Sequence, residues 1–332
     1  MNISSHPFSR FLVVATSAVL LAACGSSDGD GGGQPQTGFL TVGVTDAPLD
    51  MAAAVVVKFT GVELKPQDGP AFSIDFATSK SLDLIQLQGE DRALLLDDEE
   101  IPAGEYEWMR LKVEADPNVP GDSYLRLTEP GSECELRIPS GDQSGLKLIR
   151  GFTIGLGTMT DFTIDFDLRK SIVEPPGQQT IVDTCNNQAF MLKPVLRIVD
   201  NLQVGTIAGD VDPTLIGSQC AGSDQEPYPG NVYLFGPIPT AEDVTPDDYD
   251  GVDDPLTSAM VDPDTFRYTI GFVPAGNYRV AYTCDLDNIE VDAVVPPATG
   301  ETVEFTPPEG ILVTVTANAA QEVDFVAPLP TP

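Results

Sequence analysis

Six aspartates lie close together in one segment of the second half. Closely spaced carboxylates are the kind of side chain from which proteins build calcium sites. The six aspartates lie within residues 242–265 and are Asp243, Asp247, Asp248, Asp250, Asp253 and Asp254. Calcium takes roughly six to eight oxygen ligands, which aspartates on a flexible loop can supply. The spacing departs from the EF-hand pattern, because Pro246 occupies the first ligand position when Asp248 and Asp250 are aligned. The segment therefore favours a solvated acidic loop, with bound Ca²⁺ as the alternative and no other cofactor expected.

Histidine is absent beyond the N-terminal segment, since the one histidine of the chain is His6. Catalysis by Ser-His-Asp or Cys-His groups is thereby excluded, as are histidine-ligated zinc, copper and haem sites. A glycosidase needs two carboxylates at a set separation, but carboxylates are too abundant here for their presence to identify a pair. Trp108, the one tryptophan, lies in an expected strand, where packing is favoured over sugar stacking. We therefore predict no catalytic residue and expect a protein that is not an enzyme.

The chain has five cysteines, of which Cys24 belongs to the N-terminal segment. The other four are Cys134, Cys185, Cys220 and Cys284. An even number in an exported protein favours two disulfides, although four cysteines allow three pairings. Closeness along the chain favours a disulfide between Cys134 and Cys185 and another between Cys220 and Cys284. Each bond would close a loop of roughly 50 to 65 residues and contribute about 4 kcal/mol to stability. The chain has no CxxC motif, so the expected role is structural.

The N-terminal segment predicts export and lipid anchoring. Residues 1–23 combine a cation, Arg10, with an apolar run that is shorter than the roughly 20 residues of a membrane-spanning helix, which is typical of a secretory signal. The sequence Leu21-Ala22-Ala23-Cys24 resembles the bacterial lipobox, which implies cleavage before Cys24 and acylation of that residue. Several acyl chains give firm anchoring. Residues 24–36, rich in glycine, serine and aspartate, predict a flexible tether.

Composition bounds the class of protein. The chain has 332 residues with a formal net charge of −34, and because phosphate binding needs clustered cations, nucleic acid is excluded as a partner. The same charge favours an acidic, soluble surface. About 300 residues remain after the expected processing, enough for two domains. We expect these domains at 37–201 and 202–328, followed by a disordered tail at 329–332.

Alternation of apolar and polar residues predicts strands through both halves. The expected strands are 39–44, 54–64, 71–76, 106–115, 134–138, 161–168, 192–200, 231–235, 266–272, 277–284, 311–317 and 322–327. Pro194 makes the strand at 192–200 an edge or bulged strand, and only 81–100 has a partly helical pattern. The predicted fold class is all-β, with two antiparallel β-sandwich domains after the cleaved lipoprotein signal and the flexible tether.

Two short motifs predict turns. The sequence Pro-Ala-Gly-x-Tyr occurs at 102–106 and again at 274–278, each time before a strand. Proline fixes φ, glycine permits positive φ, and the tyrosine is expected to pack its ring while its hydroxyl stays near water. The second motif is Thr45-Asp46-Ala47-Pro48, for which a turn after the first strand is favoured over a ligand-binding role.

Several blocks of the first half resemble, in order, a bacterial lipoprotein domain. They are TGFLTVGVTDAPLD (37–50), FTGVELKP (59–66), SLDLIQLQG (81–89), LLLDDEEIPAGEYEWMRLKV (94–113), IPSGDQSGLKLIRGFTI (138–154), FTIDFDLRKSIVEPPG (162–177) and FMLKPVLRIVD (190–200). Together they resemble the family of domain of unknown function 4382, which implies a β-rich extracytoplasmic domain in a frequent lipoprotein context and supplies no established activity to transfer. The second half more loosely resembles carboxypeptidase-regulatory-like, transthyretin-type sandwiches through VGTIAGDV (204–211) and TFRYTIGFVPAGNYRVAY (265–282).

These observations predict a lipid-anchored protein of the bacterial cell envelope. Gly25 after the lipobox cysteine resembles a sorting signal for the outer membrane, with the protein facing the periplasm or the cell surface. The expected function is that of a non-catalytic binding or structural module. Its expected partners are the membrane, through the N-terminal lipid, and a glycan or protein of the envelope or the exterior. The alternatives are a hydrolase that acts on glycans with carboxylates alone and a calcium-stabilised structural stalk.

Overall fold

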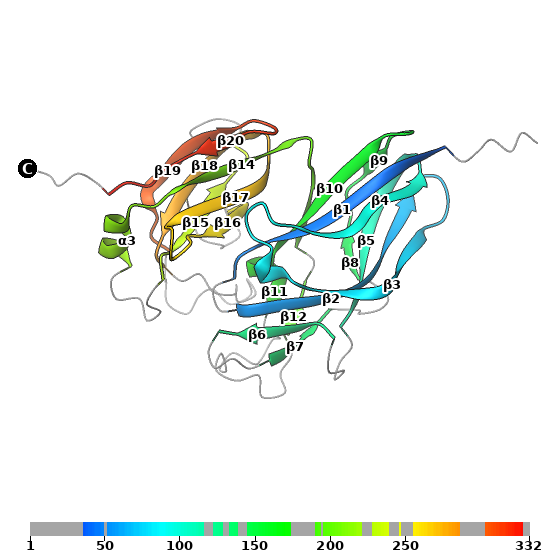
Figure 1. Ribbon diagram of the computed structural model, residues 1–332, viewed down its shortest axis with the longest axis horizontal. Helices are drawn as coiled ribbons and strands as arrows, with labels where there is room; N and C mark the ends of the chain where they lie inside the picture. Colours follow the sequence, from blue (N-terminus) through cyan, green and yellow to red (C-terminus); the bar gives the residue numbers. More distant parts are fainter. Residues whose placement is uncertain are drawn as a thin grey trace, which may run out of the picture. The chain divides into compact units, whose positions relative to one another are not determined.

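The alternating segments form strands in nearly every place where the pattern predicts them. A computed structural model describes residues 36–49, 52–115, 122–128, 133–138, 145–173, 190–193, 195–220, 228–238, 246, 255–285 and 303–327. The chain from Gln36 to Pro332 forms one compact unit (Figure 1). Among the described residues, no helix has the length and apolar character that crossing a membrane requires.

The first half consists of strands and two short helical turns. In chain order these are β1 (Thr37–Ala47), β2 (Ala52–Pro66), β3 (Phe72–Asp83), the 3-10 turn η1 (Leu84–Gln86), β4 (Ala93–Pro102), β5 (Gly104–Glu114), β6 (Tyr124–Leu127), β7 (Glu133–Arg137), β8 (Leu146–Leu148), β9 (Phe152–Ile154), β10 (Met159–Asp167), α2 (Leu168–Ser171), β11 (Ile172–Val173), β12 (Phe190–Leu192) and β13 (Leu196–Asp200). Sheet I has the strand order β13-β10-β1-β4. Sheet II has the order β11-β12-β7-β6-β2-β5-β8, with β3 beside β2 and β9 beside β5. The inward side chains of both sheets form one hydrophobic core.

The second half repeats this two-sheet arrangement. Its elements are β14 (Val204–Asp210), α3 (Pro213–Gln219), β15 (Asn231–Phe235), β16 (Thr257–Met260), β17 (Arg267–Pro274), β18 (Gly276–Thr283), β19 (Thr306–Val315) and β20 (Ala320–Glu322). Sheet III has the order β17-β14-β20 and sheet IV the order β16-β15-β18-β19, and residues from both sheets share a second core. The all-β class is confirmed. Pairing is mostly antiparallel, but β1 with β10, β7 with β12 and β14 with β20 run parallel.

Three local predictions need correction. The strand expected at 322–327 overlaps β20 only at Glu322, although Phe325 forms an isolated parallel bridge with Val211. The expected strand at 192–200 is two strands, because β12 ends at Leu192 in sheet II and β13 begins at Leu196 in sheet I. A proline donates no backbone hydrogen bond, so Pro194 in the sequence between them disfavours one continuous ladder through both strands. The partly helical expectation for 81–100 is wrong beyond the single turn η1, since β3 continues to Asp83 and β4 begins at Ala93.

Both Pro-Ala-Gly-x-Tyr motifs are corners at which the chain crosses from one sheet to the other. The first connects β4 of sheet I to β5 of sheet II, and the second connects β17 of sheet III to β18 of sheet IV. In each corner the tyrosine hydroxyl donates to the proline carbonyl four residues earlier, at 2.7 Å for Tyr106 and 2.9 Å for Tyr278. Burial raises the pKa of both tyrosines. The sequence predicted hydroxyls that stay near water, but they stabilise the corners instead.

The polar side of β10 is buried, which alternation alone does not predict. Phe162, Ile164 and Phe166 point into the first core as expected, but Thr163 is 0% exposed and Asp165 is 7% exposed. A strand buried on both sides needs partners for its polar groups, because an unpaired buried polar group is costly. These partners come from β13 and from the residues that precede β4.

Candidate functional site

A cavity of about 450 Å³ lies where the two halves meet, and we call it the junction pocket. Its lining comes from the segment before β4, from the start of β10, from the residue after β13, from the start of β14, from β17, and from the turn between β19 and β20 together with the first residue of β20. The lining residues are Glu90, Arg92, Asp161, Asn201, Val204, Gly205, Thr206, Phe272, Asn318, Ala319 and Ala320. The size falls within the range of small-molecule sites, roughly 300 to 1,000 Å³. No single stretch of sequence builds it.

An ion pair between Arg92 and Asp161 forms one wall of the junction pocket. The two terminal nitrogens of the Arg92 guanidinium donate to the two carboxylate oxygens of Asp161 at 2.6 and 2.9 Å. A further hydrogen bond, at 3.3 Å, runs from Arg92 to the hydroxyl of Thr163. Gly43 makes this reach possible, because a Cβ at that position would lie only 2.8 Å from Arg92 Cδ. The paired geometry holds the guanidinium and the carboxylate in fixed orientations.

A second wall joins the segment before β4 to the second half. The hydroxyl of Thr206 in β14 donates to the carboxylate of Glu90 at 2.7 Å. The backbone next to this contact is very closely packed, since a Cβ on Gly271 of β17 would lie 2.1 Å from the carbonyl oxygen of Gly89. Only a glycine at position 271 allows the two backbones to approach so closely.

Backbone conformation also sets the shape of the junction pocket. Phe272 has φ of 52° and Asn318 has φ of 58°. The left-handed region is tolerated by asparagine but strained for a bulky residue such as phenylalanine, and such strain clusters at functional sites. Hydrogen bonds hold the turn that carries Asn318, whose backbone N–H donates to the carbonyl of Val204 at 2.7 Å. The same residue donates from its carboxamide to the carbonyl of Leu202 at 3.4 Å.

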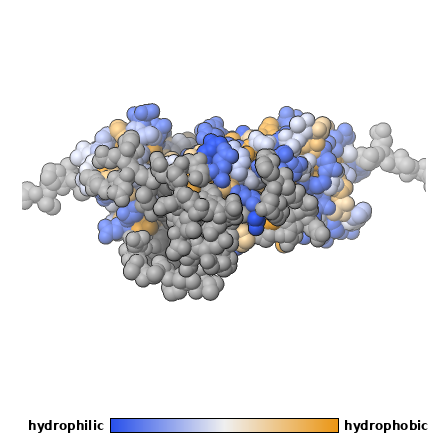
Figure 2. All heavy atoms as spheres, turned by 90° about the horizontal axis from the view of Figure 1, so that it is seen from below, coloured by the Kyte–Doolittle hydropathy of each residue, from blue (hydrophilic) through white to orange (hydrophobic). Residues whose placement is uncertain are grey.

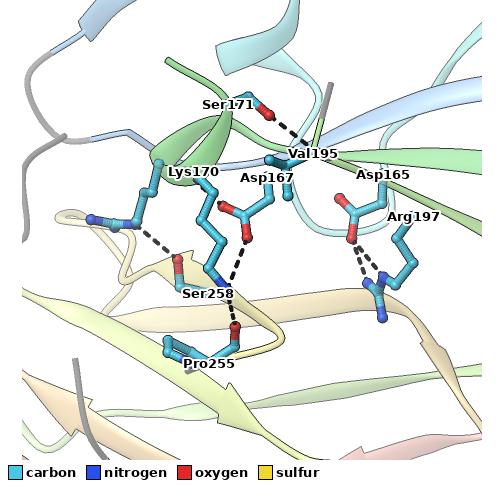
Figure 3. Close-up of polar contacts among 9 residues, drawn as sticks. Asp165, Asp167, Lys170, Ser171, Val195, Arg197, Pro255 and Ser258 are labelled. Carbon is cyan, nitrogen blue, oxygen red and sulfur yellow. Dashed lines mark hydrogen bonds and ion pairs between the residues drawn. The ribbon is translucent and has the colours of Figure 1, made fainter. Parts of the chain in front are cut away.

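A polar network joins α2 and its neighbours to β16 of the second half (Figure 3). Arg169 is 0% exposed, donates from Nε to the hydroxyl of Ser258 at 3.3 Å, and lies 5.2 Å from the ring centre of Tyr233. Lys170 donates from Nζ to the carbonyl of Pro255 at 3.3 Å. A buried guanidinium is stable only with hydrogen-bond and aromatic partners, and those of Arg169 come from the second half. These contacts therefore hold the two halves together.

Two aspartates of β10 lie in or beside this network. Figure 3 shows Asp165 facing Arg197, whose Nε donates to Asp165 Oδ2 at 3.2 Å. Asp167 accepts from the backbone N–H of Lys170 at 3.2 Å, and its Oδ2 lies 3.8 Å from Lys170 Nζ. Burial raises the pKa of Asp167 to about 6, although Lys170 acts in the opposite direction. Asp167 therefore holds its proton more tightly than an exposed aspartate does.

The second-half cysteines form the bond that their neighbourhood predicts, since a disulfide joins Cys220 to Cys284. Both sulfur atoms lie near the hydroxyl of Tyr282, at 3.1 and 3.0 Å. Cys134 is 1% exposed and is also disulfide-bonded. Cys185, its expected partner, lies outside the described residues. The described cysteines are therefore structural, and none offers a reactive thiol.

Other predicted site residues lie outside the part of the chain that the structure describes. They are the lipobox residues Leu21, Ala22 and Ala23, the lipidation residue Cys24, and the calcium candidates Asp243, Asp247, Asp248, Asp250, Asp253 and Asp254. Within the described ranges, no group of three or more His, Cys, Asp or Glu side chains could hold a metal ion. The calcium alternative stays a prediction.

Trp108 and Asp46 lie in the structure at positions that differ from the simplest expectations. The Trp108 ring is partly exposed on the outward face of sheet II, 4.9 Å from the Arg110 guanidinium and 4.2 Å from Lys147 Nζ. The ring thus serves cation–π contacts and not the core. Asp46 lies within β1, which continues to Ala47, and its N–H donates to the carbonyl of Leu87 at 2.9 Å. The turn expected at Asp46 is therefore wrong.

The residues of the junction pocket were not found from the sequence. Arg92 lies in the segment with the helical pattern, and Asp161 belongs to the alternating polar residues of β10. One usable signal was Gly271, three residues before the second corner motif begins at Pro274, because glycine within a strand indicates a bulge or a close backbone approach. The parallel pairing of β1 with β10 has no local signature, and it places Asp161 beside Thr41.

Three solved structures show distant similarity to this chain. A leucine-rich repeat protein from Bacteroides thetaiotaomicron is 13% identical, with 88% of this chain and 27% of that chain covered and a TM-score of 0.18. The Bacillus anthracis TIE protein is 7% identical over 88% of this chain and 33% of that chain, also with a TM-score of 0.18. This chain thus spans a third or less of the length of both. The minor pilin GBS52 of Streptococcus agalactiae is 10% identical, with 88% and 98% covered and a TM-score of 0.17. Alignments at such TM-scores carry no argument about fold or function.

Sequence comparison gives a family match for the first half. No curated protein matches the chain. The likeness of the second half to carboxypeptidase-regulatory-like sandwiches stays a prediction. The resemblance predicted for the first half is confirmed, because residues 37–194 match the model of the family described as Domain of unknown function (DUF4382).

Proposed function

We propose that this protein is a bacterial lipoprotein whose junction pocket binds a glycan at the cell envelope, without catalysing a reaction. In this proposal residues 1–23 are removed, Cys24 is acylated, and the tether at 24–36 links the folded part to the outer membrane. The partner is a glycan of the envelope or of the exterior, and the binding group is a sugar residue that enters the pocket.

The observation that carries the proposal is the fixed polar wall of the junction pocket. Each sugar hydroxyl both donates and accepts a hydrogen bond, so it fits a site that offers a donor and an acceptor side by side. The pair of Arg92 with Asp161 supplies both, because the guanidinium has five N–H groups and the carboxylate has about four acceptor positions. The ring of Phe272, partly exposed in the same lining, offers an apolar surface for the carbon side of a sugar.

The same wall favours binding over hydrolysis. A glycosidase uses one carboxyl group as an acid and a second as a base or nucleophile, at a set separation. The pocket contains two carboxylates, Glu90 and Asp161. Both oxygens of Asp161 accept from Arg92, and Glu90 accepts from Thr206. A carboxylate whose two oxygens both accept from one guanidinium is held in a fixed orientation as a hydrogen-bond acceptor, which suits ligand binding better than proton donation to a leaving group.

A glycan array followed by titration calorimetry tests the binding function. We expect Asp161→Asn to weaken binding of the selected glycan about tenfold, since losing one charged hydrogen bond costs roughly 1.4 kcal/mol. Asp75→Asn is the matched control, because Asp75 pairs with Lys112 on the outward face of sheet II. An array without a selected glycan, or equal losses in both variants, would contradict the proposal.

Lipid anchoring needs a separate experiment. Cells given an alkyne analogue of palmitate should label the wild-type protein, and Cys24→Ala should remain unlabelled with its signal uncleaved. Protease treatment of intact cells then decides the orientation. Digestion of residues 202–328 in unbroken cells indicates the cell surface, and digestion only after the outer membrane is permeabilised indicates the periplasm. Label on the Cys24→Ala variant would contradict anchoring at this residue.

A further inference from the structure

We propose that the end of the first half at which β1 begins contacts the lipid surface, with Phe39, Leu156 and Met159 entering its interfacial layer. We call these three residues the apolar end. The proposal goes beyond anchoring through the acyl chains, although it rests on the proposed lipid anchor at Cys24. Its partner is a zwitterionic bilayer surface.

Three apolar side chains are exposed together at this end. Leu156 is 57% exposed, Met159 is 65% exposed and Phe39 is 38% exposed. Phe39 of β1 is the register partner of Met159 in β10, so their side chains lie on the same face of sheet I. Leu156 lies in the turn that connects β9 to β10, three residues before Met159. Figure 2 shows apolar side chains among hydrophilic ones at the right-hand end of the described part.

Hydrogen bonds hold the apolar end in place. The N–H of Phe39 donates to the carbonyl of Thr158 at 3.0 Å, and the N–H of Gly157 donates to the carbonyl of Thr37 at 2.8 Å. The turn that carries Leu156 is thus fixed against the first residues of β1. A fixed patch loses little conformational entropy when it binds a surface, so even a small apolar area contributes to binding.

The path of the chain brings this end close to the membrane. The first described residue, Gln36, accepts at its carbonyl from the N–H of Ala103 at 2.8 Å, in the corner that follows β4. Eleven residues, Gly25 to Pro35, separate it from the proposed acylated residue. A glycine-rich segment of this length has an average span of roughly 20 Å and a maximum of about 40 Å. The anchor therefore holds the apolar end at high local concentration near the lipid, where weak contacts become effective.

Nearby charges decide which lipid surface fits. Glu99 and Glu100 pair with Leu40 and Phe39 across β1 and β4, and both carboxylates are exposed. Glu105 is exposed beside the same corner. Anionic lipids would repel these carboxylates, with a strength that falls within about one Debye length. The end therefore favours a zwitterionic surface over an anionic one.

The experiment measures contact with lipid by fluorescence quenching. The mature chain from Cys24 is coupled through that thiol to a maleimide lipid in phosphatidylcholine vesicles, so attachment does not depend on natural acylation. Leu156→Trp places a fluorophore at the apolar end, and Leu312→Trp places one at a residue that is 50% exposed in β19. Brominated phosphatidylcholine should quench about half of the emission added by Leu156→Trp, since apolar groups enter the interface by roughly 5–10 Å. It should leave the emission added by Leu312→Trp unchanged.

Three results would overturn the proposal. They are no quenching of Leu156→Trp, equal quenching of both variants, and stronger quenching on phosphatidylglycerol vesicles than on phosphatidylcholine. A second variant, Met159→Asn in the Leu156→Trp background, should be quenched less than Leu156→Trp alone, with a value closer to that of Leu312→Trp. Because the coupling is chemical, a negative result here would leave the acylation of Cys24 intact, and a failure of palmitate labelling would leave the lipid contact measurable.

Discussion

Replacing Asp167 with asparagine should change how the stability of the protein depends on pH. The side chain is 15% exposed at the end of β10, where burial raises the pKa of its carboxyl from 3.8 to about 6. The folded state therefore binds the proton more tightly than the unfolded chain does. The contribution of the Asp167 carboxyl to the free energy of unfolding is fully present below about pH 4 and is lost as the pH rises through about 6.

The size of the effect follows from the two pKa values. A shift of one pKa unit corresponds to about 1.4 kcal/mol, so a rise from 3.8 to about 6 corresponds to about 3 kcal/mol in full. Asparagine keeps the oxygen that accepts from the backbone N–H of Lys170, so the start of α2 retains its capping bond. The carboxamide carries no charge at any pH. Relative to the wild type, Asp167→Asn should thus become more stable by about 2 kcal/mol between pH 4 and pH 7.

Urea unfolding, monitored by the fluorescence of Trp108, measures this difference at several pH values. Subtracting the wild-type curve from the variant curve removes the contributions of the other carboxyl groups, which both proteins share. Lys170→Met is the second variant, because Lys170 lowers the pKa of Asp167. Its removal should therefore raise the pH at which the stabilising contribution of Asp167 is lost. A constant difference between wild type and Asp167→Asn from pH 4 to pH 7 would refute the reasoning.

Three further predictions concern the corners, the junction and the acidic loop. Tyr278→Phe should lower the free energy of unfolding by about 1–2 kcal/mol in a urea titration, since it removes the hydrogen bond to Pro274, whereas a hydroxyl that faces water would give no change. Gly271→Ala should lower the free energy of unfolding by more than about 2 kcal/mol, because its Cβ would lie 2.1 Å from Gly89 O. Gly217→Ala is the control that should not destabilise the protein, because its Cβ would meet nothing within 4 Å and alanine is favoured over glycine within a helix such as α3. A melting curve in Ca²⁺ should match one in chelator if the loop at 242–265 is only solvated, and a higher Tm in Ca²⁺ would show binding.

Alternation predicted the strands well because it reports directly which side of a strand is apolar. In β5 the expected inward residues Met109 and Leu111 are both 0% exposed, and Val113 is 6% exposed. The disulfide of the second half was predictable for a similar reason, since Cys220 and Cys284 are the two cysteines in that half of the sequence. Such features depend on local pattern or on proximity along the chain, and both are visible in a sequence.

The junction pocket could not be predicted because its residues become neighbours only through tertiary pairing. Arg92 reaches Asp161 across β1, over Gly43, and nothing near Arg92 in the sequence indicates this contact. Period-two alternation also cannot tell a solvated polar face from a buried one. Thr163 and Asp165 alternate as a solvated face would, yet they are buried by partners from distant segments.

The burial of this polar face links the stability of the fold to the shape of the proposed binding site. Asp161 in the pocket and Asp167 in the network beneath α2 belong to the same strand, β10. Contacts of α2 with β16 and of Gly89 with Gly271 keep the two halves in one arrangement. The pocket is lined by both halves, so a change that loosens either contact should alter its shape without touching its lining. For that reason Gly271→Ala should weaken glycan binding as well as stability, and a fully retained affinity would mean that the pocket does not depend on the junction.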